Sequence, residues 1–181
     1  MPEPQKHTSS PWHVPVALED VPEEGLHIEI AADTDTRAAV AKIAELRDLP
    51  RLQADFEVAR HGADGLRVTG RVSATVGQTC VVTLEPLTNE VVEQIDLLFV
   101  PPTAKSEVEE KEEELTANED ETEPLVGGSI DLGALATEFL ILGLDPYPRK
   151  PGAVFQPLQH AASGDSPFAA LAALKKDGNA P

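Results

Sequence analysis

The feature that most constrains the fold is a strict alternation of apolar and polar residues across the middle of the chain. From Leu66 to Val76 every second residue is apolar or glycine, and the residues between them are polar. Residues 52–58 alternate in the same way, and the glycine-containing stretch His61–Gly65 separates the two runs. Because successive side chains of a strand point to opposite faces, this pattern predicts a hairpin with one buried face and one polar face.

Segments on both sides predict further strands and two main helices. Three other strands are expected at 14–18, 26–30 and 91–99, and a turn at Pro22–Gly25 joins the first two. The alternation of residues 66–76 continues in the same parity to Leu84, which is compatible with one long strand bent at Gly77–Gln78. One helix is expected from Asp33–Asp35 to a stop at Asp48–Pro50, and a second, apolar nearly all round and therefore buried, follows Gly127–Asp131.

We therefore predict an α+β fold. Its mainly antiparallel sheet has about five or six strands and is curled, which is compatible with a barrel-like closure. Two main helices cover the open face or the ends of this sheet. The expected organisation is a flexible arm at 1–13, one domain at 14–152 with a disordered acidic loop at 101–124, a linker at 153–165, a short C-terminal helix at 166–176 and a tail at 177–181.

The charge is uneven along the chain. The net charge is −18, and residues 101–124 hold ten acidic residues against two lysines. This stretch is interpreted as a solvated loop, with a tail that competes for a basic partner as the alternative. Residues 34–71 contain seven of the fourteen basic residues, which form either a solvated helix and strand face or a local patch that meets an anion.

The residue chemistry does not favour an enzyme or a direct nucleic-acid binder. Cys80 is the single cysteine, which excludes an internal disulfide and is typical of a small buried residue rather than a nucleophile. The chain lacks a phosphate-binding glycine loop, a metal-ligand spacing and a stacking platform of aromatic residues. No cofactor, metal or small-molecule substrate is expected. A signal segment and an apolar run of roughly 20 residues are also missing, so a cytoplasmic protein without membrane contact is predicted.

Several segments together resemble a known family. Gln78–Pro86 is followed by Ile130–Gly133, Asp145–Gly152 and an ending at Pro167–Lys175. In this order the segments resemble the YceD-like family, the bacterial large ribosomal RNA subunit accumulation proteins, formerly a domain of unknown function. The sequence is similar to the alphaproteobacterial-type branch. Other branches carry a Cys-x-x-Cys and a second cysteine cluster, a plausible zinc site, whereas here Thr83 stands at the second position, so the resemblance implies no metal.

The resemblance implies a role in ribosome biogenesis. We expect a non-enzymatic factor that supports large-subunit rRNA accumulation and large-subunit assembly by binding a basic ribosomal protein or assembly factor, with at most indirect or local contact to ribosomal RNA. The alternatives are an acidic protein-binding adaptor unrelated to ribosomes and a hydrolase or transferase that uses Asp145, Tyr147 and Arg149. Convergence of these three side chains in a pocket would favour the enzyme, whereas a structural clamp would bury Tyr147 against the second helix.

Two groups of site residues follow from this reading. The candidate partner contacts are Arg67, Arg71, Glu85, Arg149, Lys150, Phe168, Leu171 and Lys175, of which the arginines and Lys150 would meet phosphates. The residues of the family motifs that are expected to have structural roles are Gln78, Cys80, Leu84, Pro86, Asp131, Asp145, Pro146, Tyr147 and Pro148.

Overall fold

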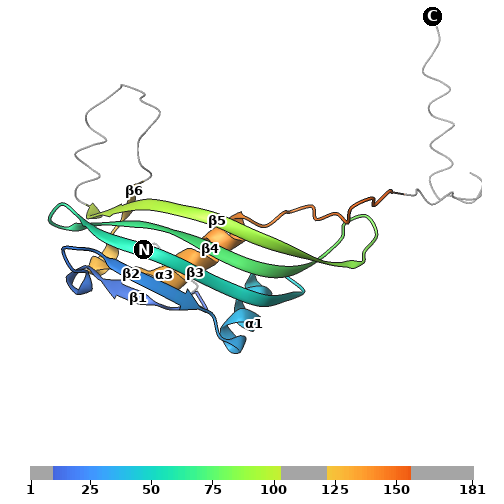
Figure 1. Cartoon of the computed structure of the whole chain (residues 1–181), viewed down its shortest axis with the longest axis horizontal. Coiled ribbons are helices and arrows are strands. Elements are labelled where there is room, and N and C mark those ends of the chain that lie inside the picture. The colour runs from blue at the N-terminus through green and yellow to red at the C-terminus, as the bar shows by residue number, and fades with distance from the viewer. Residues whose placement is uncertain (1–9, 103–121, 156–181) are drawn as a thin grey trace, which may run out of the picture.

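The computed structural model describes residues 10–102 and 122–155 (Figure 1). Most of the predicted arm (1–9), most of the acidic loop, most of the linker, the C-terminal helix and the tail lie outside these residues, whereas Trp12, which the sequence assigned to the arm, is buried in the core. The strands are β1 (Pro15–Ala17), β2 (Leu26–Ala31), β3 (Asp48–His61), β4 (Gly65–Thr79), β5 (Pro86–Val100), β6 (Thr122–Pro124) and β7 (Ser129–Asp131), the α-helices are α1 (Thr34–Ile43) and α3 (Leu132–Leu142), and two short 3₁₀ turns occupy Leu18–Asp20 and Val126–Gly128.

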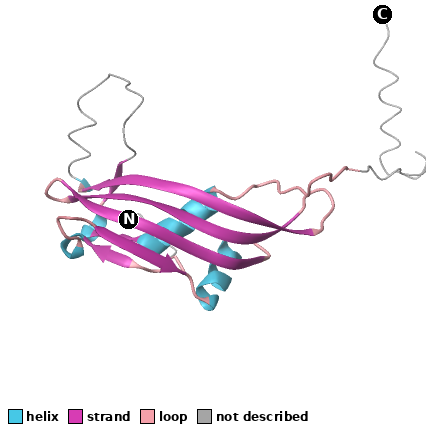
Figure 2. Ribbon diagram, viewed as in Figure 1, coloured by secondary structure: helices cyan, strands magenta, loops and turns pink. Residues whose placement is uncertain are grey.

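The main sheet has five strands in the order β2-β3-β4-β5-β6, and its pairs are antiparallel except for β5 with β6. Its long central strands curve across α3, as Figure 2 shows. The sheet is open, because β2 forms one edge and β6 the other. The α+β prediction is therefore confirmed, whereas the described strands do not form a closed barrel.

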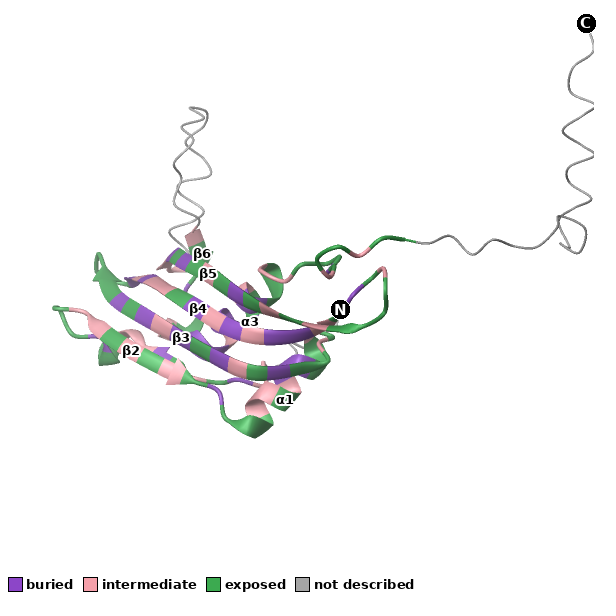
Figure 3. Cartoon of the chain, turned by 45° about the vertical axis from the view of Figure 1, so that its right-hand side comes forward, coloured by how far each residue is buried: buried purple, intermediate pink, exposed green. Residues whose placement is uncertain are grey.

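The core lies between the inner face of the sheet and the helices. Helix α3 contacts β4 and β5, and α1 contacts β3. Buried and exposed residues alternate along β3 and β4 (Figure 3), as the period of two predicts. The largest fully buried side chains include Phe56, Leu52, Leu66, Ile95, Leu132 and Leu140.

A second, two-stranded sheet ties the N-terminal segment to the start of α3. Strand β1 pairs with β7, not with β2, although the turn at Pro22–Gly25 suggested that β1 and β2 would be neighbours. The side chain of Asp131 caps α3 by accepting the backbone N–H groups of Gly133 and Ala134 at 3.1 and 3.2 Å. The same carboxylate accepts the N–H of Val14 at 2.8 Å, so one residue joins β1 to the helix.

Helix α1 ends earlier than the sequence predicted. It stops at Ile43, and Asp48–Pro50 already belongs to β3 instead of ending the helix. The chain turns at Glu45, which has a φ of 54°. The expected bend at Gly77–Gln78 lies instead on the partner strand, because the register between β3 and β4 shifts between Asp48 and Arg51.

Two further expectations were wrong. Helix α3 is not buried on all sides, since Ile141 and Leu142 at its C-terminal end are 41% and 72% exposed. Helix α3 packs against β4 and β5 of the main sheet and against β1 of the second sheet, and this leaves only Glu138, Ile141 and Leu142 of the helix exposed. Thr122–Pro124, which the sequence assigned to the acidic loop, forms β6 beside the end of β5.

Candidate partner-binding site at the turn between β4 and β5

Two segments far apart in the sequence meet at one end of the main sheet. Residues 78–86 form the end of β4 and its turn into β5, and residues 145–150 follow α3. The backbone N–H of Val81 donates to the carbonyl oxygen of Pro148 at 2.9 Å. The amide Nε2 of Gln78 donates to the carbonyl oxygen of Asp145 at 3.0 Å. We call the two joined segments, 78–86 and 145–150, the clasp.

Cys80 lies buried at the centre of the clasp. Its Sγ accepts the backbone N–H groups of Thr83 and Lys150, both at 3.4 Å. The hydrogen bond from Lys150, followed by those from Thr83, lowers the pKa of the Cys80 thiol to about 6. The prediction that Cys80 is a buried residue is confirmed. It is nevertheless a hydrogen-bond acceptor that joins the two segments, and not only a small apolar residue.

The continuation of β4 to Leu84 was a wrong interpretation of the alternation. Strand β4 ends at Thr79, and residues 80–85 form a turn. Within this turn the N–H of Cys80 donates to the carbonyl oxygen of Glu85 and the N–H of Leu84 donates to that of Cys80, both at 2.9 Å. These local bonds satisfy groups that a straight strand would have offered to β5. Pro86 then begins β5.

Two of the predicted partner contacts pair with each other on the clasp. The Nζ of Lys150 lies 3.1 Å from Oε2 of Glu85, and this hydrogen bond lowers the pKa of the Glu85 carboxyl. Both side chains are about half exposed, so solvent screens the pair and it adds little to the stability of the clasp. Both residues remain accessible to a partner.

Pro148, and not Tyr147, is the buried residue of the segment after α3. The side chain of Asp145 accepts the N–H of Tyr147 at 2.8 Å, which forms a local turn. Tyr147 is 70% exposed, so the expectation that a clamp would bury it against the helix is wrong. Asp145 and Arg149 are exposed as well. Three exposed side chains, one of which is engaged in the turn, do not favour the hydrolase or transferase alternative.

Large apolar side chains are exposed on the clasp and just beyond it. Leu84 is 76% exposed, Val81 is 44% exposed, and Val154 and Phe155 are 74% and 72% exposed. Leu84 also has a φ of 60°, a left-handed conformation that costs a leucine on the order of 1–3 kcal/mol. A strained backbone that presents an apolar side chain to solvent is typical of an interaction site. We call Val81, Leu84, Tyr147, Val154 and Phe155 the apolar tip.

Both segments of the clasp fall within the match to one protein-family model. This model, described as "Large ribosomal RNA subunit accumulation protein YceD", matches residues 68–175, which is more than half of the chain. The chain belongs to the YceD family. The family description indicates a role in the accumulation of large-subunit ribosomal RNA, and YceD is not known as a family of enzymes. Comparison with curated proteins and with solved structures gave no match.

The YceD match begins within β4, so it covers the clasp, β5 and α3 but not β1, β2, α1 or β3. The suspected family is therefore confirmed, and the clasp is the part of the described structure in which two of its motif segments meet. Among the described residues, no helix has the length and apolar character needed to cross a membrane.

The structure does not bring the predicted basic contacts together. Arg67 forms two hydrogen bonds of 3.0 Å with the carboxylate of Asp96 on the outer face of the sheet. Arg71 lies on the same face and is exposed. Cys80 follows Arg71 by nine positions along the chain, which corresponds to up to about 30 Å at the rise of a strand. The outer face of the sheet and the clasp are therefore separate surfaces. Three further predicted contacts, Phe168, Leu171 and Lys175, lie outside the described residues.

Sequence reasoning missed most of the apolar tip. Leu84 and Tyr147 were assigned structural roles, and Val81, Val154 and Phe155 were not selected as contacts. One signal was available, because Phe155 is an aromatic residue in a segment without helix or strand periodicity. The positive φ of Leu84 has no sequence signal, since glycine or asparagine would be expected at such a position.

Proposed function

We propose that this member of the YceD family supports large-subunit rRNA accumulation as a non-enzymatic assembly factor in the cytoplasm. In this proposal the clasp binds a basic ribosomal protein or assembly factor. The observation that carries the proposal is Leu84, an exposed leucine held at a positive φ in a turn within the family match, together with the other exposed side chains of the apolar tip.

The charges favour a protein partner over bare RNA. The chain has a net charge of −18, which repels phosphates. Several of its basic groups are already engaged, including Arg51 with Glu90 at 2.6 Å, Arg67 with Asp96 at 3.0 Å and Lys150 with Glu85 at 3.1 Å. A basic protein with an apolar patch would gain both long-range attraction and burial of the tip. Arg71 and Arg149 are left as secondary contacts to phosphates.

An acidic adaptor unrelated to ribosomes is the second candidate. It is favoured by the same net charge and the same apolar tip, neither of which specifies the class of partner. The two candidates differ in what remains bound to the tagged full chain after purification. A ribosome assembly factor is expected to retain a large-subunit protein or assembly factor after nuclease treatment, whereas the adaptor would retain other proteins.

The variant Leu84→Asn tests the role of the tip directly. Asparagine adopts a positive φ more readily than leucine, so we expect the variant to fold with unchanged or higher stability. The matched control is Val126→Asn, which removes a valine that is 72% exposed outside the clasp. We expect Leu84→Asn to lose the retained partner and, in cells that lack the wild-type chain, to lower the ratio of large to small ribosomal subunits.

Val126→Asn should behave like the wild-type chain in both assays. Retention of the same partner by a folded Leu84→Asn variant would contradict binding through the tip. Normal large-subunit levels in cells that lack the chain altogether would contradict the ribosomal role itself.

A further inference from the structure

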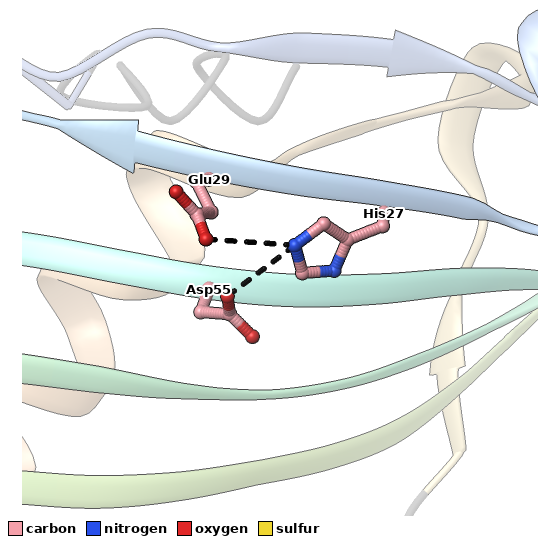
Figure 4. Close-up of side chains that lie close together, drawn as sticks. All are labelled: His27, Glu29 and Asp55. Atoms are coloured by element: carbon pink, nitrogen blue, oxygen red, sulfur yellow. Dashed lines mark ion pairs between the residues drawn. The ribbon is translucent and has the colours of Figure 1, made fainter.

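A histidine and three carboxylates gather on the outer face of the main sheet, away from the clasp. His27 and Glu29 lie two residues apart on β2, so their side chains share one face. Asp55 and Glu57 lie on the same face of β3, where Glu57 is directly opposite His27 and Asp55 is directly opposite Glu29. Figure 4 shows His27, Glu29 and Asp55 pointing toward one another. We call these four residues the outer cluster.

One hydrogen bond fixes the state of the imidazole ring. The Nδ1 of His27 lies 2.8 Å from Oε1 of Glu57. An ionised carboxylate only accepts hydrogen bonds, so Nδ1 carries the proton of this bond. In the neutral ring Nε2 therefore keeps its lone pair. This carboxylate–imidazole arrangement is the one that orients histidine ligands in metal sites.

The free nitrogen faces two carboxylates at distances suited to shared ligation. Nε2 of His27 lies 3.5 Å from Oδ2 of Asp55 and 3.7 Å from Oε1 of Glu29. These separations exceed those of good hydrogen bonds. A tetrahedral zinc ion bound at about 2.0–2.2 Å by each ligand sets the ligand atoms about 3.3–3.6 Å apart. The two separations thus match the edges of such a site to within about a few tenths of an ångström, and the three ligand atoms all lie within 4.8 Å of one another.

The negative charge of the outer cluster also favours a bound cation. Like charges directly opposite each other on neighbouring strands are destabilising, and Glu29 and Asp55 are such a pair. The nearest base on β4 is Arg71, opposite Asp55, and it forms no ion pair within the described part of the chain. A hollow lined by Glu29, Gln53, Asp55, Arg71 and Ser73 adjoins the cluster. It leaves room for water or an anion at the remaining coordination positions.

We propose that His27, Glu29 and Asp55 bind one divalent first-row transition metal ion, with Glu57 as the positioning residue for the imidazole. One nitrogen and two carboxylate ligands favour Zn²⁺ or Mn²⁺, whereas Mg²⁺ and Ca²⁺ prefer oxygen ligands alone. The site is independent of the clasp and of the proposed binding of a basic partner, and it does not involve Cys80.

The test is a calorimetric titration of the full chain with Zn²⁺ in the presence of excess Mg²⁺, which competes for weak sites made of oxygen ligands alone. We expect one saturable Zn²⁺ site per chain. The variant His27→Gln should abolish it, and Glu57→Gln should weaken it by about 10–100-fold, as loss of an orienting partner does elsewhere. The matched control is His61→Gln, which removes an exposed histidine at the far end of β3 and should bind Zn²⁺ like the wild-type chain.

A second probe separates this site from the thiol. Co²⁺ bound by nitrogen and oxygen ligands lacks the sulfur-to-metal charge-transfer band that Cys80 would produce. Circular dichroism of each variant shows whether the fold is kept, and Glu29→Gln and Asp55→Asn replace His27→Gln if that variant misfolds. Equal saturable binding by wild-type and ligand variants, absence of saturable binding, or a sulfur band would each overturn the proposal; in those cases His27 is only an ion-pair partner of the carboxylates.

Discussion

Replacing Gly70 with alanine would place a methyl group at the most crowded point of the central strands. Gly70 lies directly opposite Phe56, whose side chain is fully buried. A Cβ atom at this position would approach Cδ1 of Phe56 to 2.9 Å and would also collide with the carbonyl oxygen of Asp55. The ring can rotate slightly, but the carbonyl belongs to the β3–β4 ladder. Overpacking of this kind lowers the free energy of unfolding by about 1–3 kcal/mol.

Urea denaturation followed by the fluorescence of Trp12 measures this cost, because Trp12 is the single tryptophan and is only 6% exposed. With a slope of about 2 kcal/mol per molar urea, a loss of about 2 kcal/mol moves the midpoint by about 1 M. The control Thr69→Ala, on the outer face of the same strand, should change stability by less than about 0.5 kcal/mol.

A double-mutant cycle identifies the clash. Phe56→Ala alone should cost about 3–5 kcal/mol. If the ring is part of the crowding, Gly70→Ala should cost at least about 0.5 kcal/mol less in the Phe56→Ala background than in the wild-type chain. A Gly70→Ala protein as stable as the wild type, or costs that add without coupling, would refute the close packing of Phe56 on Gly70.

Two further predictions concern Cys80 and Asp131. Cys80→Ala should lower the free energy of unfolding without abolishing partner retention. Because the folded pKa of about 6 lies below that of an unfolded thiol, the stabilisation by the Cys80 thiolate is complete above the unfolded pKa and is lost as the pH falls through 6. The difference in urea unfolding between the wild-type and Cys80→Ala proteins should therefore be smaller at pH 5.5 than at pH 8. A folded Cys80→Ser protein that retains no partner would contradict the structural role. Asp131→Ala removes the cap of α3 and the contact to Val14, and thermal or urea unfolding should show a loss of about 1–2 kcal/mol, whereas a change below about 0.5 kcal/mol would contradict the capping role.

The lowered pKa of Asp131 gives that last prediction a pH dependence. Burial opposes ionisation of this carboxyl, but the N–H groups of Val14 and Ala134, together with the side chain of His13, outweigh it and lower the pKa. The stabilisation is therefore present at neutral pH and is lost only as the pH falls through the folded pKa, below the usual range of an aspartate. Wild-type and Asp131→Ala proteins should converge in stability in strong acid.

The strands of the hairpin and their faces could be predicted because alternation is a local property. The side chains of residues 52–58 and 66–76 point to opposite faces whatever else surrounds them, and the burial pattern follows. The same reasoning failed at Cys80–Leu84, where apolar residues of the right parity form a turn. There the backbone groups found partners within the turn and on the segment after α3, and no periodicity encodes that choice.

Sequence patterns were enough to predict the β-rich α+β architecture, the polar outer face of the sheet, the family and the segments that form the clasp. Which segments meet became visible in the folded chain alone: β1 pairs with β7, the thiol of Cys80 accepts the N–H of Lys150, and His27 lies beside Glu29 and Asp55. The physical reason is that periodicity and turn chemistry act between neighbours in the chain, whereas these contacts depend on strand order and register. Those are set by how the whole core closes around α3.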